Sequence, residues 1–561
     1  MLVKRFRNFI EQQAEEKSFL LEDEKVQPLN NLSESQIYAF KKIEPAVTKA
    51  KYQVSILHGV TGSGKTEIYK HLILRCFEMQ KSTILLLPEV SLAMRFEAIM
   101  KATFGQQNVL GFHSASTNQH KKLLWKSLIN HSPCLIIGVH LPVLLPIANL
   151  GMIVVDEEHE VGYQEKKHPR LNSKELAILR AKQTEIPIIL GSATPSISSL
   201  HALNRPEWQL VSLTERFAGA LPNIKLVKIN PTEKKQHFLI TNELQQTMTE
   251  RLHKKEQIII FLNRRGYSFF VQCLNCLFIF NCNHCSVSLT LHADNILRCH
   301  YCDFKQSLPL SCPECRCRRF IKKGVGTQQI VSILEKIFPS ARIARADLDS
   351  TAKKREWGKT AQAFHEQKID ILVGTQTITK GYHFPNVTLV GILWADINLN
   401  LPLFNAAETT LQQILQVAGR AGRQKLHSDV IVQTMSPHPI FNFLTETNYL
   451  QFYESEIKKR ALAQYPPVSR LAEIEIKSRQ EKLAESETEE IYYHLKNKQQ
   501  YASSTITVLG PVKPTISKLK NWHIRKIYLK SNNMISLIEF YKTISLASFK
   551  SQISFIPTPL S

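Results

Sequence analysis

The sequence has no long apolar run. No stretch of its 561 residues reaches the roughly 18 to 20 consecutive apolar positions that a membrane-spanning helix needs. Its first residues, MLVKRFRNFIEQQAEEKSF, carry charges throughout and lack the apolar core of a secretory signal. We therefore expect a cytoplasmic protein without a membrane partner, in a compartment where thiols stay reduced.

Acidic residues are scarce relative to basic ones. The chain has 48 Asp and Glu residues against 71 Lys and Arg residues, which gives a formal net charge of +23. Such an excess favours a polyanionic partner, because phosphates neutralised by the protein release their counterions. A basic surface that only faces solvent is the alternative. Hydrophobic residues make up 43% of the chain, and its length predicts about three or four domains.

One glycine-rich segment has the spacing of a phosphate-binding loop. In VSILHGVTGSGKTEIYKHLI, an apolar strand leads through Gly59, Gly62 and Gly64 into a helix. Glycines let backbone N–H groups surround a phosphate, and the N-terminus of the helix adds positive charge. We expect Lys65 to reach the β- and γ-phosphates of ATP, and the Thr66 hydroxyl to bind Mg²⁺.

An acidic segment follows another apolar strand, in LGMIVVDEEHE. We expect Asp156 to hold Mg²⁺ and Glu157 to orient the water that attacks the nucleotide. Taken alone, DEEH is also compatible with a solvated loop. The phosphate-binding loop upstream favours the catalytic interpretation.

Three further segments indicate a motor rather than a simple nucleotide binder. SAT, at residues 192–194, follows one apolar strand, and GTQTITKG, which ends at Gly381, follows another. We expect Gly381 to lie at the nucleotide. In QVAGRAGR, Arg420 and Arg423 stand three residues apart, on one helical face. Both can stabilise charge on the transferring γ-phosphoryl group, although a basic helix end is the alternative for either arginine alone.

The order of these segments resembles the superfamily 2 helicases, in which two RecA-like lobes share one ATP at their interface. The resemblance also suggests a role for Gln36, in LSESQIYAF upstream of the phosphate-binding loop. Such helicases often have a glutamine there that reads adenine. A buried or merely solvated glutamine is the alternative.

Cysteine is almost confined to one segment of the chain. Nine of the 11 cysteines lie between Cys273 and Cys317, and only Cys76 and Cys134 lie elsewhere. Four CxxC pairs supply eight thiolates, the number that two tetrahedral zinc sites need, and Cys317 is left over. A redox role would need a thioredoxin-like context, which is absent. Spacing alone does not decide which of the pairs share a metal: Cys273/Cys276, Cys282/Cys285, Cys299/Cys302 and Cys312/Cys315.

The position of this cluster identifies a narrower resemblance. It lies between FLNRRGYS and KKGVGTQQI, inside the expected second lobe, as in the PriA (primosomal protein N′) family of replication-restart DNA helicases. LLLPEVSL, GSATPS, YPPVSRLA and VLGPVKP add to the similarity, which covers roughly residues 32–530. The resemblance implies that the outer pairs, Cys273/Cys276 and Cys312/Cys315, share one structural zinc. It implies that the inner pairs, Cys282/Cys285 and Cys299/Cys302, share the second.

The same resemblance implies the activity and the partners. It implies an ATP-dependent 3′→5′ DNA helicase that acts at stalled or forked DNA and restarts replication by primosome assembly. Its cofactors would be ATP, Mg²⁺ and two Zn²⁺. Its partners would be forked and single-stranded DNA, single-strand-binding protein, primosome proteins and the replicative helicase loader.

The expected fold class is α/β, with two RecA-like parallel-sheet helicase lobes. A two-zinc, cysteine-rich insertion interrupts the second lobe, and a small α+β domain ends the chain. Runs such as QVSIL, TILLLP, MIVVD, QIIIFLN and VTLVGIL predict strands buried on both faces. The expected boundaries are a charged lead-in at 1–30, the first lobe at 31–220, the second lobe at 221–437 with its insertion at about 270–318, and the C-terminal domain at 438–561.

Two of the chain's departures from the family pattern concern its N-terminus and its CxxC turns. Only 58 residues precede Gly59, too few for the family's two N-terminal DNA-binding domains, so we do not expect recognition of a nascent 3′ end. Leu277 and Asp303 stand where glycines normally follow the CxxC turns, which predicts less ideal turn geometry. Two alternatives stay open: a shortened zinc scaffold that binds DNA or primosome proteins without unwinding, and a superfamily 2 translocase that acts on RNA.

DNA contact is expected to be electrostatic first. Three clusters of basic residues are candidates for this contact, although each cluster taken alone is also typical of a solvated surface. Trp522, within the third cluster, is available to stack on a base. The clusters are Lys166, Lys167, His168 and Arg170; Arg316, Arg318, Arg319, Lys322 and Lys323; and Lys513, Lys518, Lys520, Arg525 and Lys526.

Overall fold

The computed structural model describes most of residues 29–559, and the statements below concern those residues. The chain forms two compact units, Met1–Phe217 and Ala218–Ser561. The expected lead-in at 1–30 lies almost entirely outside the described residues. In the part of the chain that is described, no helix is both long and apolar enough to cross a membrane. The segments left out within that range are 166–170, 217–220, 230–238, 263–270, 277, 284–287, 293–294, 300–302, 322–325, 347–352, 376–377, 379–383, 401–402, 423–426, 502–505, 515–516, 520 and 558.

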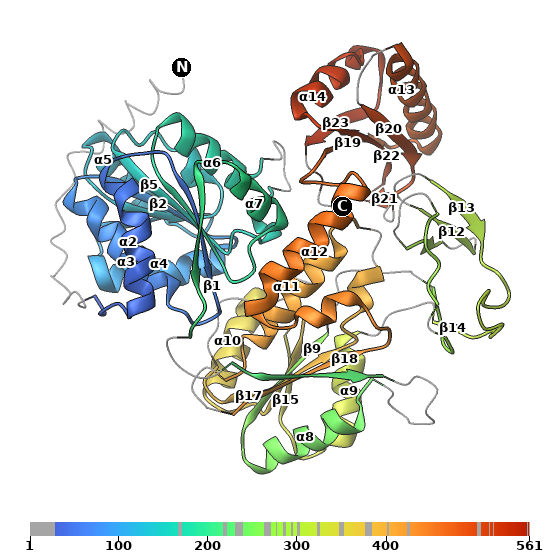
Figure 1. The fold of residues 1–561 in the computed structure, drawn as a ribbon, viewed down its shortest axis with the longest axis horizontal. Helices are drawn as coiled ribbons and strands as arrows, with labels where there is room; N and C mark the ends of the chain where they lie inside the picture. The colour runs from blue at the N-terminus through green and yellow to red at the C-terminus, as the bar shows by residue number, and fades with distance from the viewer. Residues whose placement is uncertain are drawn as a thin grey trace. The chain divides into compact units, whose positions relative to one another are not determined.

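The first unit is built on a seven-stranded parallel sheet with the order β3-β4-β2-β5-β6-β1-β7. Its central strands are aliphatic because both faces are covered by helices: α2, α3 and α4 lie on one side, and α6 and α7 on the other (Figure 1). The strands are β1 (Val54–Gly59), β2 (Ser82–Leu86), β3 (Val109–Phe112), β4 (Leu135–Gly138), β5 (Leu150–Asp156), β6 (Ile188–Ser192) and β7 (Trp208–Leu213). The helices are α2 (Glu34–Thr48), α3 (Lys65–Glu78), α4 (Val90–Phe104), α5 (Asn118–Ile129), α6 (Ser173–Gln183) and α7 (Ile197–His201).

The parallel arrangement brings three sequence motifs to one edge of this sheet. Strand β6 pairs with β1 on one side and β5 on the other, so that His58 is opposite Ser192 and Asp156 is opposite Gly191. The loops that follow the three strands therefore leave the sheet side by side. In open parallel sheets this carboxyl edge is where ligands bind.

The second unit begins with a six-stranded parallel sheet, in the order β15-β16-β9-β17-β18-β8. The two parallel-sheet lobes predicted from the apolar runs are thereby confirmed. The strands are β8 (Asn223–Lys228), β9 (Gln257–Leu262), β15 (Ile343–Ala346), β16 (Ile371–Gly374), β17 (Val387–Leu393) and β18 (Asp429–Thr434). The helices are α8 (Asn242–His253), α9 (Thr327–Ile337), α10 (Lys353–His365) and α11 (Ala406–Ala418).

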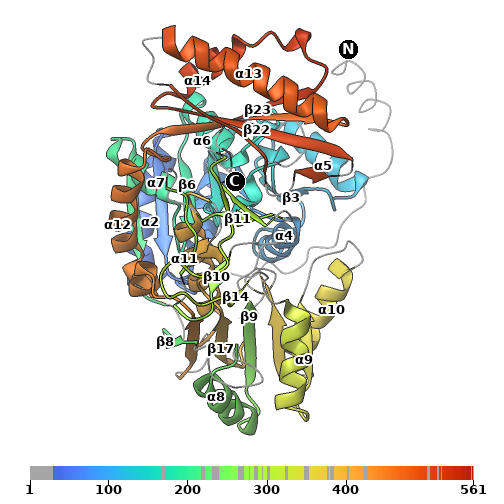
Figure 2. The ribbon, with the colours of Figure 1, turned by 90° about the vertical axis from the view of Figure 1, so that its right-hand side faces the viewer.

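The C-terminal domain is an antiparallel sheet with helices on one face. Its strands run in the order β20-β22-β19-β23, and β21 also pairs with β22. Helices α13 and α14 lie on the same side of the sheet (Figure 2). The elements are α12 (Tyr449–Leu462), β19 (Arg470–Ser478), α13 (Glu481–Tyr501), β20 (Thr507–Val512), β21 (Lys518–Leu519), β22 (Trp522–Ser531), α14 (Met534–Lys542) and β23 (Gln552–Pro557).

The other face of this sheet packs against the cysteine-rich insertion. Side chains alternate along a strand, so Ile527 and Leu529 face the helices while Tyr528 joins Leu297 and Phe280 of the insertion in one buried cluster. Cys282 and Cys299 belong to the same cluster. The insertion is thus not folded around metal alone, because part of its core is shared with the C-terminal domain. Its strands are β10 (Gln272–Cys273), β11 (Thr290–Leu291), β12 (Ile296–Arg298), β13 (Lys305–Ser307) and β14 (Phe320–Ile321).

A buried arginine connects helix α11 to the start of the C-terminal domain. Arg460 of α12 is 3% exposed, and its Nη2 lies 2.8 Å from Glu408 Oε2 of α11. Its Nε lies 3.2 Å from Glu456 Oε1, and its Nη1 donates to the carbonyl of Pro466. The guanidinium therefore satisfies two buried carboxylates and the chain that leads into β19.

We predict that Arg460→Met destabilises the second unit by about 3–5 kcal/mol, because it leaves two buried carboxylates without their counter-charge. The readout is the denaturant midpoint of that unit's unfolding transition. Lys459→Met, at the exposed neighbouring position on α12, is the matched control and should leave the midpoint unchanged. Equal midpoints for the two variants would contradict the role given to Arg460.

Candidate nucleotide site and zinc cluster

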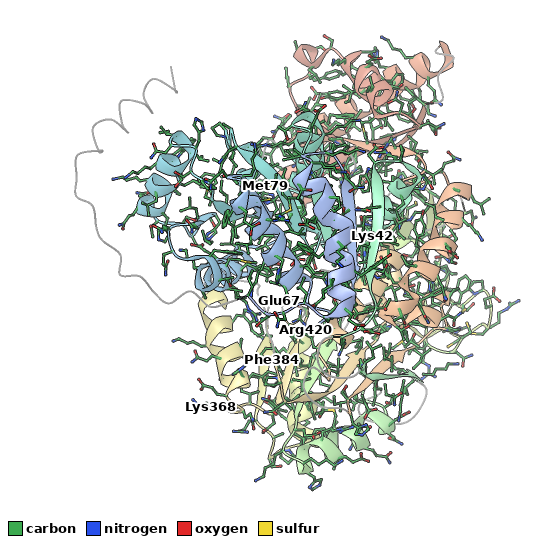
Figure 3. All side chains as sticks on the ribbon, turned by 60° about the vertical axis from the view of Figure 1, so that its left-hand side comes forward. Lys42, Glu67, Met79, Lys368, Phe384 and Arg420 are labelled. Atoms are coloured by element: carbon green, nitrogen blue, oxygen red, sulfur yellow. The ribbon has the colours of Figure 1, made fainter. Side chains whose placement is uncertain are left out.

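The phosphate-binding loop joins β1 to α3 and depends on glycine. Gly62 and Gly64 have φ of 86° and 81°, in the left-handed region that side chains disfavour. A Cβ on Gly64 would lie 2.2 Å from Gln36 Nε2, so even alanine would clash there. Lys65 Nζ donates to the Gly59 carbonyl at 2.7 Å, which holds the ammonium over the loop. Thr66 follows Lys65 in the first turn of α3, beside Glu67, which is labelled in Figure 3.

Gln36 is hydrogen-bonded to this loop and to the start of its own helix. Its Nε2 donates to the Ser63 carbonyl at 2.9 Å, and its Oε1 accepts from the Ser33 N–H at 2.9 Å. The side chain is 2% exposed. The buried-glutamine alternative that the sequence left open therefore describes its position, while a role in reading adenine stays a prediction.

Asp156 ends β5 and is joined to the loop's own helix. Tyr69 of α3 donates to Asp156 Oδ1 at 2.9 Å, and Tyr163 donates to the Asp156 backbone carbonyl. Burial, and then the neighbouring Glu157 carboxylate, raise the pKa of Asp156 to about 6. Two carboxylates held together in this way have the chemistry of a divalent-cation site, because a cation offsets their repulsion.

Glu157 occupies a strained turn. Its φ of 50° is uncommon for a residue with a side chain and marks a conformation that the surroundings impose. Its Oε2 is buried and accepts no hydrogen bond from the described residues; the nearby His159 Nδ1 is 3.7 Å away. His159 Nδ1 instead hydrogen-bonds Ser192 Oγ at 2.7 Å, which links DEEH to SAT.

Two residues that sequence reasoning missed complete the connections at this edge. His58 Nε2 donates to the Ala193 carbonyl at 3.1 Å, and burial, followed by the Lys65 charge, lowers the pKa of His58 to about 4. His58 is therefore a neutral donor between β1 and SAT. Glu158, the third acidic residue of DEEH, forms a buried ion pair with Lys174 at 2.9 Å. Ala193 is far from His58 in the sequence, and Lys174 is far from Glu158. Sequence spacing therefore gave no indication of either contact.

The structure brings the two outer cysteine pairs together. The sulfurs of Cys273, Cys276, Cys312 and Cys315 all lie within 4.8 Å of one another. Cys273 and Cys315 Sγ are 3.5 Å apart, and Cys276 and Cys312 Sγ are 3.4 Å apart. Zinc with Zn–S bonds of about 2.3 Å needs sulfurs about 3.8 Å apart in a tetrahedron, so the four thiols fit the metal.

The inner pairs are described only in part, because Cys285 and Cys302 lie outside the described residues. Asp303, after the second inner pair, has φ of 58°, and Arg316, after the last pair, has φ of 61°. Residue 303, where a glycine is normal in the family, thus has the left-handed backbone conformation, and an aspartate adopts it. In three pairs the first cysteine N–H donates to the carbonyl five residues later: Cys273 to Phe278, Cys299 to Phe304, and Cys312 to Cys317. Cys299 thus shares this hydrogen bond with Cys273 and Cys312 of the outer cluster.

The remaining expected site residues are only partly described. Arg420 follows α11 and is labelled in Figure 3, whereas Gly381 and Arg423 lie outside the described residues. The roles assigned to all three stay predictions. The same holds for the basic cluster at 166–170, which is also outside the described residues.

The other two basic clusters differ from each other. Arg316, Arg318 and Arg319 are exposed next to the zinc ligands. In the tail cluster Lys513, Arg525 and Lys526 pair with carboxylates, which corrects the expectation for these three residues, whereas Lys518 is exposed and Lys520 lies outside the described residues. Arg525 is buried and pairs with Glu481 and Glu485, and its neighbours are also paired or stacked. Those neighbouring contacts are Lys513 with Glu481, Lys526 with Glu473, and Arg479 over Trp522.

Family models match three parts of the chain. Residues 34–203 match the DEAD/DEAH box helicase model, residues 282–306 the PriA DNA helicase Cys-rich region, and residues 320–425 the helicase conserved C-terminal domain. Among solved structures, RecG bound to a three-way DNA junction aligns with 82% of this chain and 48% of that chain, at 17% identity and a TM-score of 0.45. A likeness at that level carries no argument about function.

Curated relatives give a stronger result. The replication restart protein PriA of Bacillus subtilis is 37% identical over 533 residues, covering 94% of this chain and 66% of that protein. The PriA protein of Helicobacter pylori J99 is 33% identical over 525 residues, covering 92% and 80%. Five PriA relatives, including the Bacillus subtilis protein, are matched over 59% to 66% of their own length. The chain belongs to the PriA family of replication restart proteins, as these identities, the matching cysteine-rich region and the two parallel-sheet lobes together show.

Proposed function

We propose that this chain is an ATP-dependent 3′→5′ DNA helicase that acts at forked or stalled DNA and promotes primosome assembly. The observation that carries the proposal is the bond from Tyr69 to Asp156. Tyr69 is four residues beyond Lys65 on α3, one turn along the same helix. The helix that begins at the phosphate-binding loop is thus tied directly to the carboxylate expected to hold Mg²⁺.

The proposed roles follow from the chemistry of each side chain. Lys65 would leave the Gly59 carbonyl for the β- and γ-phosphates, where its charge is better compensated. Thr66 and Asp156 would hold Mg²⁺, which supplies charge neutralisation at the transferring phosphoryl group. The buried Oε2 of Glu157, which accepts no hydrogen bond from the described residues, supports its assignment as the acceptor that orients water.

Several partners belong to the proposal. The net charge of +23 and the exposed arginines beside the outer cysteine cluster support contact with the DNA backbone. Single-strand-binding protein, primosome proteins and the helicase loader are proposed from family membership. Two structural zinc ions are proposed, one at the outer cysteines and one at Cys282, Cys285, Cys299 and Cys302.

We predict that the purified chain displaces a strand from a duplex with a 3′ single-stranded tail in the presence of Mg²⁺ and ATP. Lys65→Ala should lower the rate at least about 100-fold, because the γ-phosphate loses its principal cation. Lys49→Ala, at an exposed lysine of the same unit, is the control. Displacement by Lys65→Ala at the control rate would refute the assigned site. A wild-type chain that binds forked DNA but displaces nothing would favour the non-unwinding scaffold.

We predict about two zinc ions per purified chain, since eight clustered thiolates fill two tetrahedral sites. Cys312→Ser should remove about one of them, whereas Cys317→Ser should leave the content unchanged. Elemental analysis of the folded variants measures both. A wild-type content near one ion would leave the outer site standing and reject the inner one.

A further inference from the structure

A buried ion pair lies directly behind the acidic turn, and the proposed mechanism does not use it. The Glu158 side chain is fully buried and the Lys174 side chain is 10% exposed. Lys174 comes from the first turn of α6, whereas Glu158 is part of the DEEH loop after β5. A buried pair of this kind gives little net stability over an apolar pair, so its presence calls for another reason.

Glu158 connects three segments of the carboxyl edge. Its Oε1 accepts from the Ser196 N–H at 2.6 Å, and its Oε2 accepts from the Ser199 hydroxyl at 2.8 Å. Its backbone N–H donates to the Gly191 carbonyl at 3.0 Å. Lys174 Nζ reaches both Glu158 Oε2 at 2.9 Å and Ser196 Oγ at 3.3 Å. The residue after the strained turn is therefore fixed by charge-assisted bonds from two other elements.

The strain at Glu157 gives this arrangement a consequence. A left-handed backbone at a residue with a side chain persists only when the surrounding bonds over-determine it. Glu158 follows Glu157 directly, so the bonds that fix Glu158 also fix the direction in which the Glu157 peptide leaves the turn. The Glu160 N–H also donates to the Glu157 carbonyl, at 2.9 Å, which closes the turn from the other side.

We propose that Lys174 is a positioning residue for ATP hydrolysis: through Glu158 it holds the turn that aims the Glu157 carboxylate. The inference rests on the proposed function, since it assigns Lys174 a part in that reaction. The hydrogen bonds described for Lys174 go to Glu158 and Ser196, which lie outside the phosphate-binding loop. Loss of Lys174 should therefore affect the chemical step more than nucleotide affinity.

Lys174→Met tests this directly, because methionine preserves much of the side-chain volume and removes the cation. We expect kcat for ATP hydrolysis to fall about 10- to 100-fold, the scale of a small misplacement of a reacting group. The affinity for a fluorescent ATP analogue should stay within about twofold of wild type, and that titration also counts the folded sites. Lys174→Arg should restore most of kcat, because it keeps the cation.

Two further variants separate positioning from a general loss of structure. Lys182→Met, at an exposed lysine of the same helix, should behave as wild type. The double variant Lys174→Met/Glu158→Gln should lose less activity than Lys174→Met alone, because no uncompensated buried carboxylate remains. Failure of Lys174→Arg to recover kcat, or a parallel fall in kcat and nucleotide affinity, would overturn the proposal.

Amide hydrogen exchange gives a readout that does not depend on hydrolysis. The Glu158 and Ser196 amides should exchange faster in Lys174→Met than in Lys182→Met, because the bonds that protect them are weakened. Equal exchange in the two variants would overturn the inference even if the wild-type chain is an active ATPase. A wild-type chain without ATP hydrolysis would instead overturn the proposed function, and exchange would still decide whether Lys174 holds the turn.

Discussion

The carboxyl edge of the first sheet depends on the hydrogen bond between Tyr69 and Asp156. Strand β6 lies between β1 and β5, so the phosphate-binding loop and DEEH are not joined by a common ladder. The 2.9 Å bond from Tyr69 to Asp156 Oδ1 spans this separation from the helix side. On the strand side, His58 and His159 bond to Ala193 and Ser192 of SAT. These hydrogen bonds thereby join the segments that follow three separate strands.

Much of this edge could be predicted from the sequence, because residue type and spacing largely determine its geometry. Gly62 and Gly64 occupy backbone conformations that favour glycine, so their positions carry structural information without the fold. The fold class was predictable for a similar reason, since uninterrupted aliphatic runs are typical of strands covered on both faces. The ion pair of Glu158 with Lys174 could not be predicted, because it forms only when α6 packs beside β5.

The basic residues of the sequence were a poor guide to which cations are exposed in the fold. Arg525 counts as a cation in the sequence and contributes to a cluster that is typical of a nucleic-acid surface. In the fold it is 4% exposed and satisfied by Glu481 and Glu485 from the first turns of α13. A sequence shows the cations of a cluster but not the carboxylates that fold against them. Of the expected basic surface, Arg316, Arg318, Arg319 and Lys518 are exposed among the described residues.

The cysteine-rich insertion has a second support besides metal. The spacing predicted thiolate sites, but it carried no sign that Phe280 and Leu297 share a core with Tyr528 of the C-terminal sheet. Since Cys282 and Cys299 belong to that core, the inner turns and the sheet stabilise each other. Arg460 joins the same domain to α11, the helix that leads into QVAGRAGR. The second lobe, the insertion and the C-terminal domain are therefore connected by buried contacts rather than by linkers alone.

We propose that ATP turnover in this chain is coupled to DNA. Steady-state ATP hydrolysis, measured without DNA, with single strands and with a forked duplex, tests it most directly. We expect slow hydrolysis by the protein alone and strong stimulation by both DNA substrates. Hydrolysis at the same rate under all three conditions, by folded and zinc-loaded protein, would contradict it.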